Sequence, residues 1–262
     1  MNPLFYHHSS VRGNRTRFML RPLILLTVLI TLTPVAAGEG SQKGRPNDLP
    51  TEYVTRDIEG WTVRVDRRLQ QPQHSELGCR AEKLLANRLY LLKMMVAPDP
   101  LADLQRFTIV LDLNHGQLRS MQYHPSERWL VSNGYSAELT RCVHIPLADR
   151  FVNPQHHLRQ PWVVLHELAH AYHDQVLGFE HAAIKESWQQ AVDAKRYESV
   201  LHIDGDKRRH YALTNQKEFF AEMSEAYLGL NDFYPFHRAD LKQDNPPLYK
   251  LMQSIWGKTP AP

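Results

Sequence analysis

One segment of sixteen residues constrains the fold of this chain more than any other. Between Pro161 and Gly178 the sequence reads WVVLHELAHAYHDQVL, without a further proline or glycine. Pro161 suits the first position of a helix, and Gly178 is typical of a helix end. The helix between them is apolar over much of its circumference, and such a helix is buried. The chain therefore has to pack other elements around it.

The middle of this helix carries the pattern His-Glu-x-x-His. His166 and His170 lie one turn apart, about 6 Å along the helix axis, so their imidazoles project from one face. Two imidazoles at this spacing are able to bind one Zn²⁺ at about 2.1 Å. Glu167 lies beside them, too far round the helix to be a good ligand, and is placed to accept a proton from the attacking water. The pattern predicts one zinc ion per chain, and two core histidines bound to backbone carbonyls are the alternative.

A second acidic segment supplies the remaining ligand that a zinc site needs. A catalytic zinc ion has three protein ligands and an open fourth position. Glu218 begins the run EFFAE at 218–222 and is the candidate for the third ligand. Because a metal-bound histidine usually donates its other N–H group to a carboxylate or carbonyl, Glu222, one turn later, is predicted to accept that hydrogen bond. Glu225 is expected on a solvated helix face.

These two segments resemble the catalytic domain of anthrax lethal factor and its relatives, including the Pro-Pro endopeptidases. The likeness rests on HELAH at 166–170 and YALTNQKEFFAE at 211–222, and it covers about residues 160–230. The resemblance implies that Glu218 is the third zinc ligand. It implies that Tyr211, seven residues earlier, points at the metal and stabilises the oxyanion. It also implies a zincin-like α+β fold, in which the edge strand of a small mixed sheet pairs with extended substrate.

The remaining sequence predicts strands in the first half and helices in the second, which is typical of an α+β domain. Residue periodicity and turn signals predict the following elements. The strands are expected at 61–65, 107–113, 129–132 and 142–147, and the helices at 75–95, 182–194, 218–230 and 248–256. Thr214 or Asn215 is expected to cap the helix that follows it. The segment 142–147 is the candidate for the substrate-pairing edge strand.

Residues 1–37 have the pattern of a signal peptide. A region with four arginines precedes an uncharged apolar stretch at 23–35, and Ala36-Ala37 suits cleavage by signal peptidase. Met19 offers a tidier translation start. A membrane-spanning helix needs about 20 apolar residues, whereas this stretch is shorter and contains Pro34. Export with cleavage is therefore favoured over a retained membrane anchor.

The rest of the chain is expected to be one exported domain. Residues 38–52 are predicted to form a linker, and residues 53–262 a zincin-like domain, either secreted or periplasmic. Of the 31 Lys and Arg residues, four lie in the leader, which leaves 27 against 28 Asp and Glu residues. This balance gives no reason to expect nucleic-acid binding. The expected partner is a peptide or protein substrate.

The two cysteines, Cys79 and Cys142, do not have the spacing of a metal or redox motif. In an oxidising compartment an even number of cysteines favours one disulfide. Two buried free thiols are the alternative.

The motifs together predict an exported zinc endopeptidase with Glu167 as general base and Tyr211 as oxyanion stabiliser. One alternative is a catalytically inactive, lethal-factor-like module that binds zinc and a partner, although the intact Glu167 argues against it. Another is a metal-dependent hydrolase of a non-peptide substrate. Two further histidines, His202 and His210, are expected in loops or at the surface.

Overall fold

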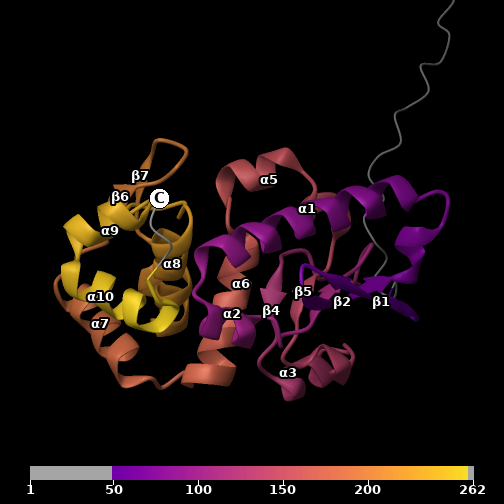
Figure 1. Ribbon diagram of the computed structural model, residues 1–262, viewed down its shortest axis with the longest axis horizontal. Coiled ribbons are helices and arrows are strands. Elements are labelled where there is room, and N and C mark those ends of the chain that lie inside the picture. The colour runs from indigo at the N-terminus through magenta and orange to yellow at the C-terminus, as the bar shows by residue number, and fades with distance from the viewer. Residues whose placement is uncertain (1–48, 259–262) are drawn as a thin grey trace, which may run out of the picture. The chain divides into compact units, whose positions relative to one another are not determined.

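A five-stranded mixed sheet dominates the first half of the described chain, which comprises residues 49–258 of a computed structural model (Figure 1). The predicted signal peptide and most of the predicted linker lie outside these residues. The strand order is β1-β2-β3-β5-β4. Strands β2 and β5 run parallel to the central β3, whereas β1 and β4 are antiparallel to their neighbours. The strands are β1 (Tyr53–Ile58), β2 (Trp61–Asp66), β3 (Ile109–Leu111), β4 (Gln122–Tyr123) and β5 (Val143–Ile145).

The edge of this sheet corrects one prediction. The segment 142–147 does form β5, but β5 pairs with β3 on one side and β4 on the other, so it is not an edge strand. The two edge strands are β1 and β4, and β4, the neighbour of β5, has only two residues. A strand this short leaves no periodicity to detect, because alternation needs about four residues.

The sheet separates two apolar clusters, because successive side chains of a strand point to opposite faces. Ile109 and Leu111 of β3 join the main core with helix α1 (Ser75–Met95), whereas Val110 between them joins a smaller cluster. Cys142 is buried in that smaller cluster, and Cys79 is exposed on α1. The two cysteines therefore lie on different faces of the sheet. Both are free, so the expected disulfide does not form, and only one of the two thiols is buried.

Helices fill the second half of the described chain. The predicted buried helix is α6 (Val163–Tyr172), which continues as one π-helical turn (His173–Leu177) and ends at Gly178 with φ 80°. Helix α8 (Gln216–Leu228) packs against it, and the side chain of Asn215 caps α8 by accepting from two backbone N–H groups. The helices α7 (Ala182–Asp193), α9 (Arg238–Asp244) and α10 (Pro246–Trp256) surround α8 (Figure 1).

One predicted strand is a helix. Residues 129–132 belong to α3 (Glu127–Ser132), where the Ser126 side chain accepts from the backbone N–H of Trp129 as an N-cap. This capping bond outweighs the weak strand propensity of the tryptophan and valine in the segment. The shorter elements are α2 (Pro98–Leu104), α4 (Ala148–Phe151), α5 (Pro154–Arg159) and the hairpin of β6 (Val200–Leu201) with β7 (Lys207–Arg208). Among residues 49–258 no helix has the length and apolar character needed to cross a bilayer.

Candidate metal centre

Three predicted ligand side chains converge between α6 and α8. His166 and His170 extend from one face of α6, and Glu218 extends from the first turn of α8. Glu218 Oε2 lies 3.1 Å from Nε2 of His166 and 3.2 Å from Nε2 of His170. Packing of α8 against α6 thus brings together residues that are about fifty positions apart in sequence. We call this group the His-His-Glu cluster.

The donor atoms of the His-His-Glu cluster fit a divalent metal ion. Neighbouring ligand atoms of a tetrahedral zinc site with bonds of about 2.1 Å lie about 3.4 Å apart, close to the two distances found here. The Nδ1 atom of His166 lies 2.7 Å from a carboxylate oxygen of Glu225 and donates to it. Burial disfavours the charged form of His166, but hydrogen bonds to Glu218 and Glu225 outweigh it and raise the pKa of His166 well above its usual value, so without a metal ion a proton lies between Nε2 and Glu218. A shared cation makes this arrangement favourable.

Glu225 corrects the predicted surroundings of the ligands. This residue is fully buried and accepts the hydrogen bond from His166, whereas Glu222 is 3.6 Å from the same Nδ1 atom. The expectation of a solvated helix face at Glu225 is therefore wrong, and Glu222 is not the hydrogen-bond acceptor. Residues 218, 222 and 225 follow the spacing i, i+4, i+7, which places them on one helix face. That spacing could have identified Glu225 as a residue near the histidines, because the ligand Glu218 defines the face of α8 that packs against α6.

Burial and neighbouring charge shift the pKa values of these carboxyl groups in opposite directions. Burial raises the pKa of Glu225 to about 7. Burial and the charge of Asp232 raise the pKa of Glu222 well above its usual range. Burial also disfavours the charged form of Glu218, but hydrogen bonds from His166 and His170 outweigh it and lower the pKa of Glu218. Glu218 is therefore the carboxylate with the strongest preference for the ionised form that a metal ligand needs.

Glu167 is attached to the edge of the sheet. Its Oε2 atom accepts a hydrogen bond of 2.8 Å from the backbone N–H of Tyr123 in β4. Within residues 49–258 no hydrogen bond reaches its Oε1 atom. The hydroxyl of Tyr123 donates to Asp174 at 2.6 Å, so this tyrosine fixes β4 to both α6 and the turn that follows it. Burial raises the pKa of Glu167, which makes it a stronger base than an exposed glutamate.

A cavity of about 510 Å³ opens over the His-His-Glu cluster. Its lining also includes Glu167, Tyr211 and the two residues of β4. Tyr211 is half-exposed, and its ring centroid lies 6.5 Å from that of His166. The structure thus places Tyr211 beside the cluster, in the short 3₁₀ helix Tyr211–Thr214.

Two histidines near this cavity were expected in loops or at the surface. Both lie outside the named helices and strands, but both are buried. His202 is 7% exposed and lines the cavity, and His210 is 0% exposed. Nδ1 of His210 accepts from the backbone N–H of Ala212 and so caps the short helix that begins with Tyr211. Burial lowers the pKa of His210 to about 3, which keeps the ring neutral as this acceptor role requires. The residue thus positions the backbone at Tyr211, and no pattern in the sequence signals that role.

Comparisons with known proteins found no matching family model, no matching curated protein and no matching solved structure.

Proposed function

We propose that this protein is a zinc-dependent endopeptidase. The observation that carries the proposal is the approach of two α6 histidines and one α8 carboxylate to a common point, with Glu167 buried between that point and the sheet edge. The resemblance of 160–230 to lethal factor and its relatives supports the same assignment. A bound zinc ion would supply a water of lowered pKa and polarise the scissile carbonyl.

The residues around the ligands have separate roles in the proposed reaction. Glu167 accepts the proton of the attacking water through Oε1 and passes it to the leaving amine. The backbone N–H of Tyr123 holds Oε2 and so fixes the orientation of this carboxylate. The hydroxyl group of Tyr211, a half-exposed residue, donates a hydrogen bond to the developing oxyanion.

The position of β4 favours a peptide over other hydrolysable substrates. β4 is one of the two edge strands of the sheet, and it lines the cavity next to Glu167. An edge strand has backbone N–H and C=O groups on its free side. Because the N–H of Tyr123 already donates to Glu167, an extended peptide would pair with the remaining backbone groups of β4. Substrate bound in this way lies along β4 with its scissile carbonyl beside the His-His-Glu cluster.

The first test is the zinc content of the purified protein. We expect about one zinc ion per chain in the wild type and a clear loss in Glu218→Ala, because two imidazoles alone leave the ion without its anionic ligand. Glu186→Ala, at an exposed position of α7, is the matched control and should retain the metal. Zinc is measured by elemental analysis after extensive dialysis. Equal zinc content in wild type and Glu218→Ala would contradict the proposed site.

Glu225 provides a second prediction for the same site. Glu225→Ala is expected to weaken zinc binding by about 10–100-fold, because His166 loses the carboxylate that orients it. Glu225→Gln keeps an acceptor oxygen and should lie between the wild type and the alanine variant. Glu222→Gln is the control, since Glu222 is too far from Nδ1 of His166 to accept this bond. Competition with a zinc chelator measures the affinities, and a larger effect at Glu222 would reverse the roles assigned to these two residues.

We also propose that the protein is exported. The proposal rests on the signal-peptide pattern of residues 1–37, which lie outside the described part of the chain. N-terminal sequencing of the protein from its native host should place the mature end after Ala37. A retained leader would contradict export with cleavage.

A further inference from the structure

A second hollow lies beside the metal centre along the edge strand. Its volume is about 350 Å³, and it is lined by Gln122, Tyr123, His124, Pro125, Ser126 and Trp129. Gln122 and Tyr123 also line the cavity over the His-His-Glu cluster, so the two hollows adjoin at β4. We call the second hollow the aromatic pocket.

Trp129 gives the aromatic pocket a fixed apolar surface. Its indole is 46% exposed, although large apolar side chains are usually more buried. The ring stacks near Tyr135 at a centroid distance of 6.0 Å, and it lies nearly parallel to His124 at 6.3 Å. Its backbone N–H is held by the Ser126 cap of α3. The exposed face is thus oriented in advance, which lowers the entropic cost of binding an apolar group.

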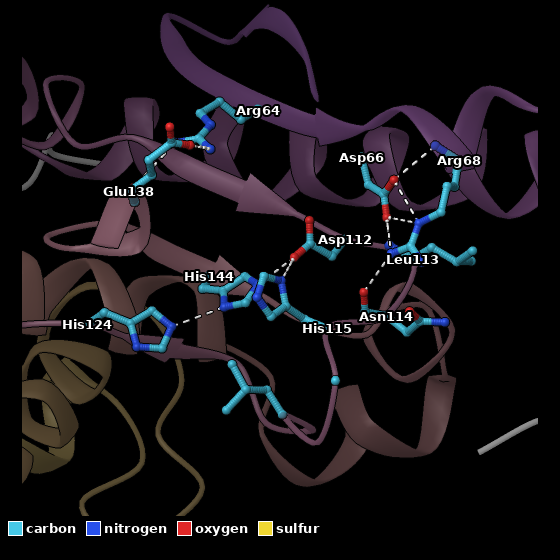
Figure 2. A network of polar contacts seen from close by, with 12 residues as sticks. Arg64, Asp66, Arg68, Asp112, Leu113, Asn114, His115, His124, Glu138 and His144 are labelled. Atoms are coloured by element: carbon cyan, nitrogen blue, oxygen red, sulfur yellow. Dashed lines mark hydrogen bonds and ion pairs between the residues drawn. The ribbon is translucent and has the colours of Figure 1, made fainter. Parts of the chain in front are cut away.

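His124 is held by a chain of buried polar groups. Its Nε2 atom lies 3.0 Å from Nδ1 of His144, and Nε2 of His144 lies 2.7 Å from Oδ2 of Asp112 (Figure 2). Burial raises the pKa of Asp112, but hydrogen bonds from His115 and His144 outweigh it and lower that pKa below its usual value. Asp112 is therefore an ionised acceptor at the end of this chain.

The ionised Asp112 determines where the protons lie. It accepts N–H from Nε2 of His144, which leaves Nδ1 of His144 as an acceptor for the Nε2–H of His124. Burial lowers the pKa of His124 to about 3, so this ring is neutral and its Nδ1 atom has a free lone pair. Within residues 49–258 no hydrogen bond reaches that atom. His124 therefore offers a hydrogen-bond acceptor in the wall of the aromatic pocket.

The same residues are better explained as a hydrogen-bonded chain than as a second metal site. Asp112, His115 and His144 have ligand atoms within 4.8 Å of one another. However, Asp112 Oδ2 lies only 2.5 and 2.7 Å from the two histidine nitrogens. These are distances of short hydrogen bonds to an ionised acceptor, and they are well below the separation of about 3.4 Å between ligands of tetrahedral zinc.

We propose that the aromatic pocket is a substrate subsite that selects an aromatic side chain carrying a hydrogen-bond donor, above all tyrosine. This inference rests on the proposed peptidase function. The aromatic pocket and the cavity over the His-His-Glu cluster share Gln122 and Tyr123. Because a paired peptide advances about 3.3 Å per residue, the selected side chain would lie a few residues from the scissile bond. The ring packs on Trp129, and the phenol hydroxyl donates to Nδ1 of His124.

The test measures kcat/KM for matched peptides that carry Tyr, Phe or Ala at each position within three residues of a mapped cleavage site. At one position we expect tyrosine to exceed alanine by about 10–100-fold and phenylalanine by about 3–10-fold, the effect of one hydrogen bond. Trp129→Ala should reduce the tyrosine-to-alanine ratio to about 2-fold or less, mainly through KM. Tyr90→Ala, which removes a half-exposed aromatic ring from α1, is the control and should preserve the ratio.

A second variant tests the acceptor. His124→Phe keeps a planar ring but removes the lone pair, so tyrosine and phenylalanine peptides should be cleaved equally well. If the variant does not fold, wild-type protein still tests the acceptor. Equal kcat/KM values for the tyrosine and phenylalanine peptides would exclude a hydrogen bond from the phenol hydroxyl to His124. Cleavage without a Trp129-dependent aromatic preference overturns the subsite alone. Failure of zinc-loaded wild type to cleave any peptide of a mixed library overturns the proposed peptidase and this inference with it.

Discussion

Replacing Glu167 by glutamine is expected to slow peptide hydrolysis by about 10²–10⁴-fold, the usual contribution of a positioned general base. Glutamine has nearly the same shape, and its carbonyl oxygen still accepts the hydrogen bond from the backbone N–H of Tyr123. The amide cannot take a proton from water at neutral pH. The loss of activity is therefore expected to come from the missing proton acceptor and not from a change in the structure of the site.

Zinc content and stability are the controls for this variant. Glu167 is not in the His-His-Glu cluster, so Glu167→Gln should retain about one zinc ion per chain. Its free energy of unfolding should equal or exceed that of wild type, because the substitution removes a buried carboxyl group whose pKa is raised by burial. A zinc-loaded Glu167→Gln variant with wild-type kcat/KM would refute the assigned role.

Truncation of Trp256 to alanine is expected to lower the free energy of unfolding by about 3–5 kcal/mol. Trp256 is fully buried at the end of α10 and packs against Phe220 of α8 and Tyr172 of α6. Its indole N–H also donates to Ser224 on α8. The substitution leaves a large cavity behind the two helices that carry the metal ligands, so zinc affinity should fall as well.

The matched control is Trp129→Ala, which removes the same side chain from an exposed position. Because Trp129 is 46% exposed and, within residues 49–258, has ring contacts only with Tyr135 and His124, this variant should lose far less stability than Trp256→Ala, about 1 kcal/mol or less. Urea unfolding followed by circular dichroism measures both variants. A loss of less than about 1 kcal/mol for Trp256→Ala would be incompatible with the close packing described here.

Elements with local signals could be predicted from the sequence alone. The helix with His166 and His170, the cap at Asn215 and the helix that follows it are confirmed because periodicity and capping depend on residues within a few positions. The side-chain spacing on α6 also fixed which residues were able to share a metal ion. Glu218 was found through its place in a resemblance, and the packing of α8 on α6 brings it to the two histidines.

Tertiary structure decided the features that depend on distant partners. Glu225 instead of Glu222 binds His166, since the rotation of α8 against α6 selects the carboxylate that reaches Nδ1. The two-residue β4 became an edge strand through pairing with β5, and the fold brought His124 into contact with His144. A local pattern is unable to specify these contacts, because packing between elements far apart in sequence sets which side chains meet and which groups lose water.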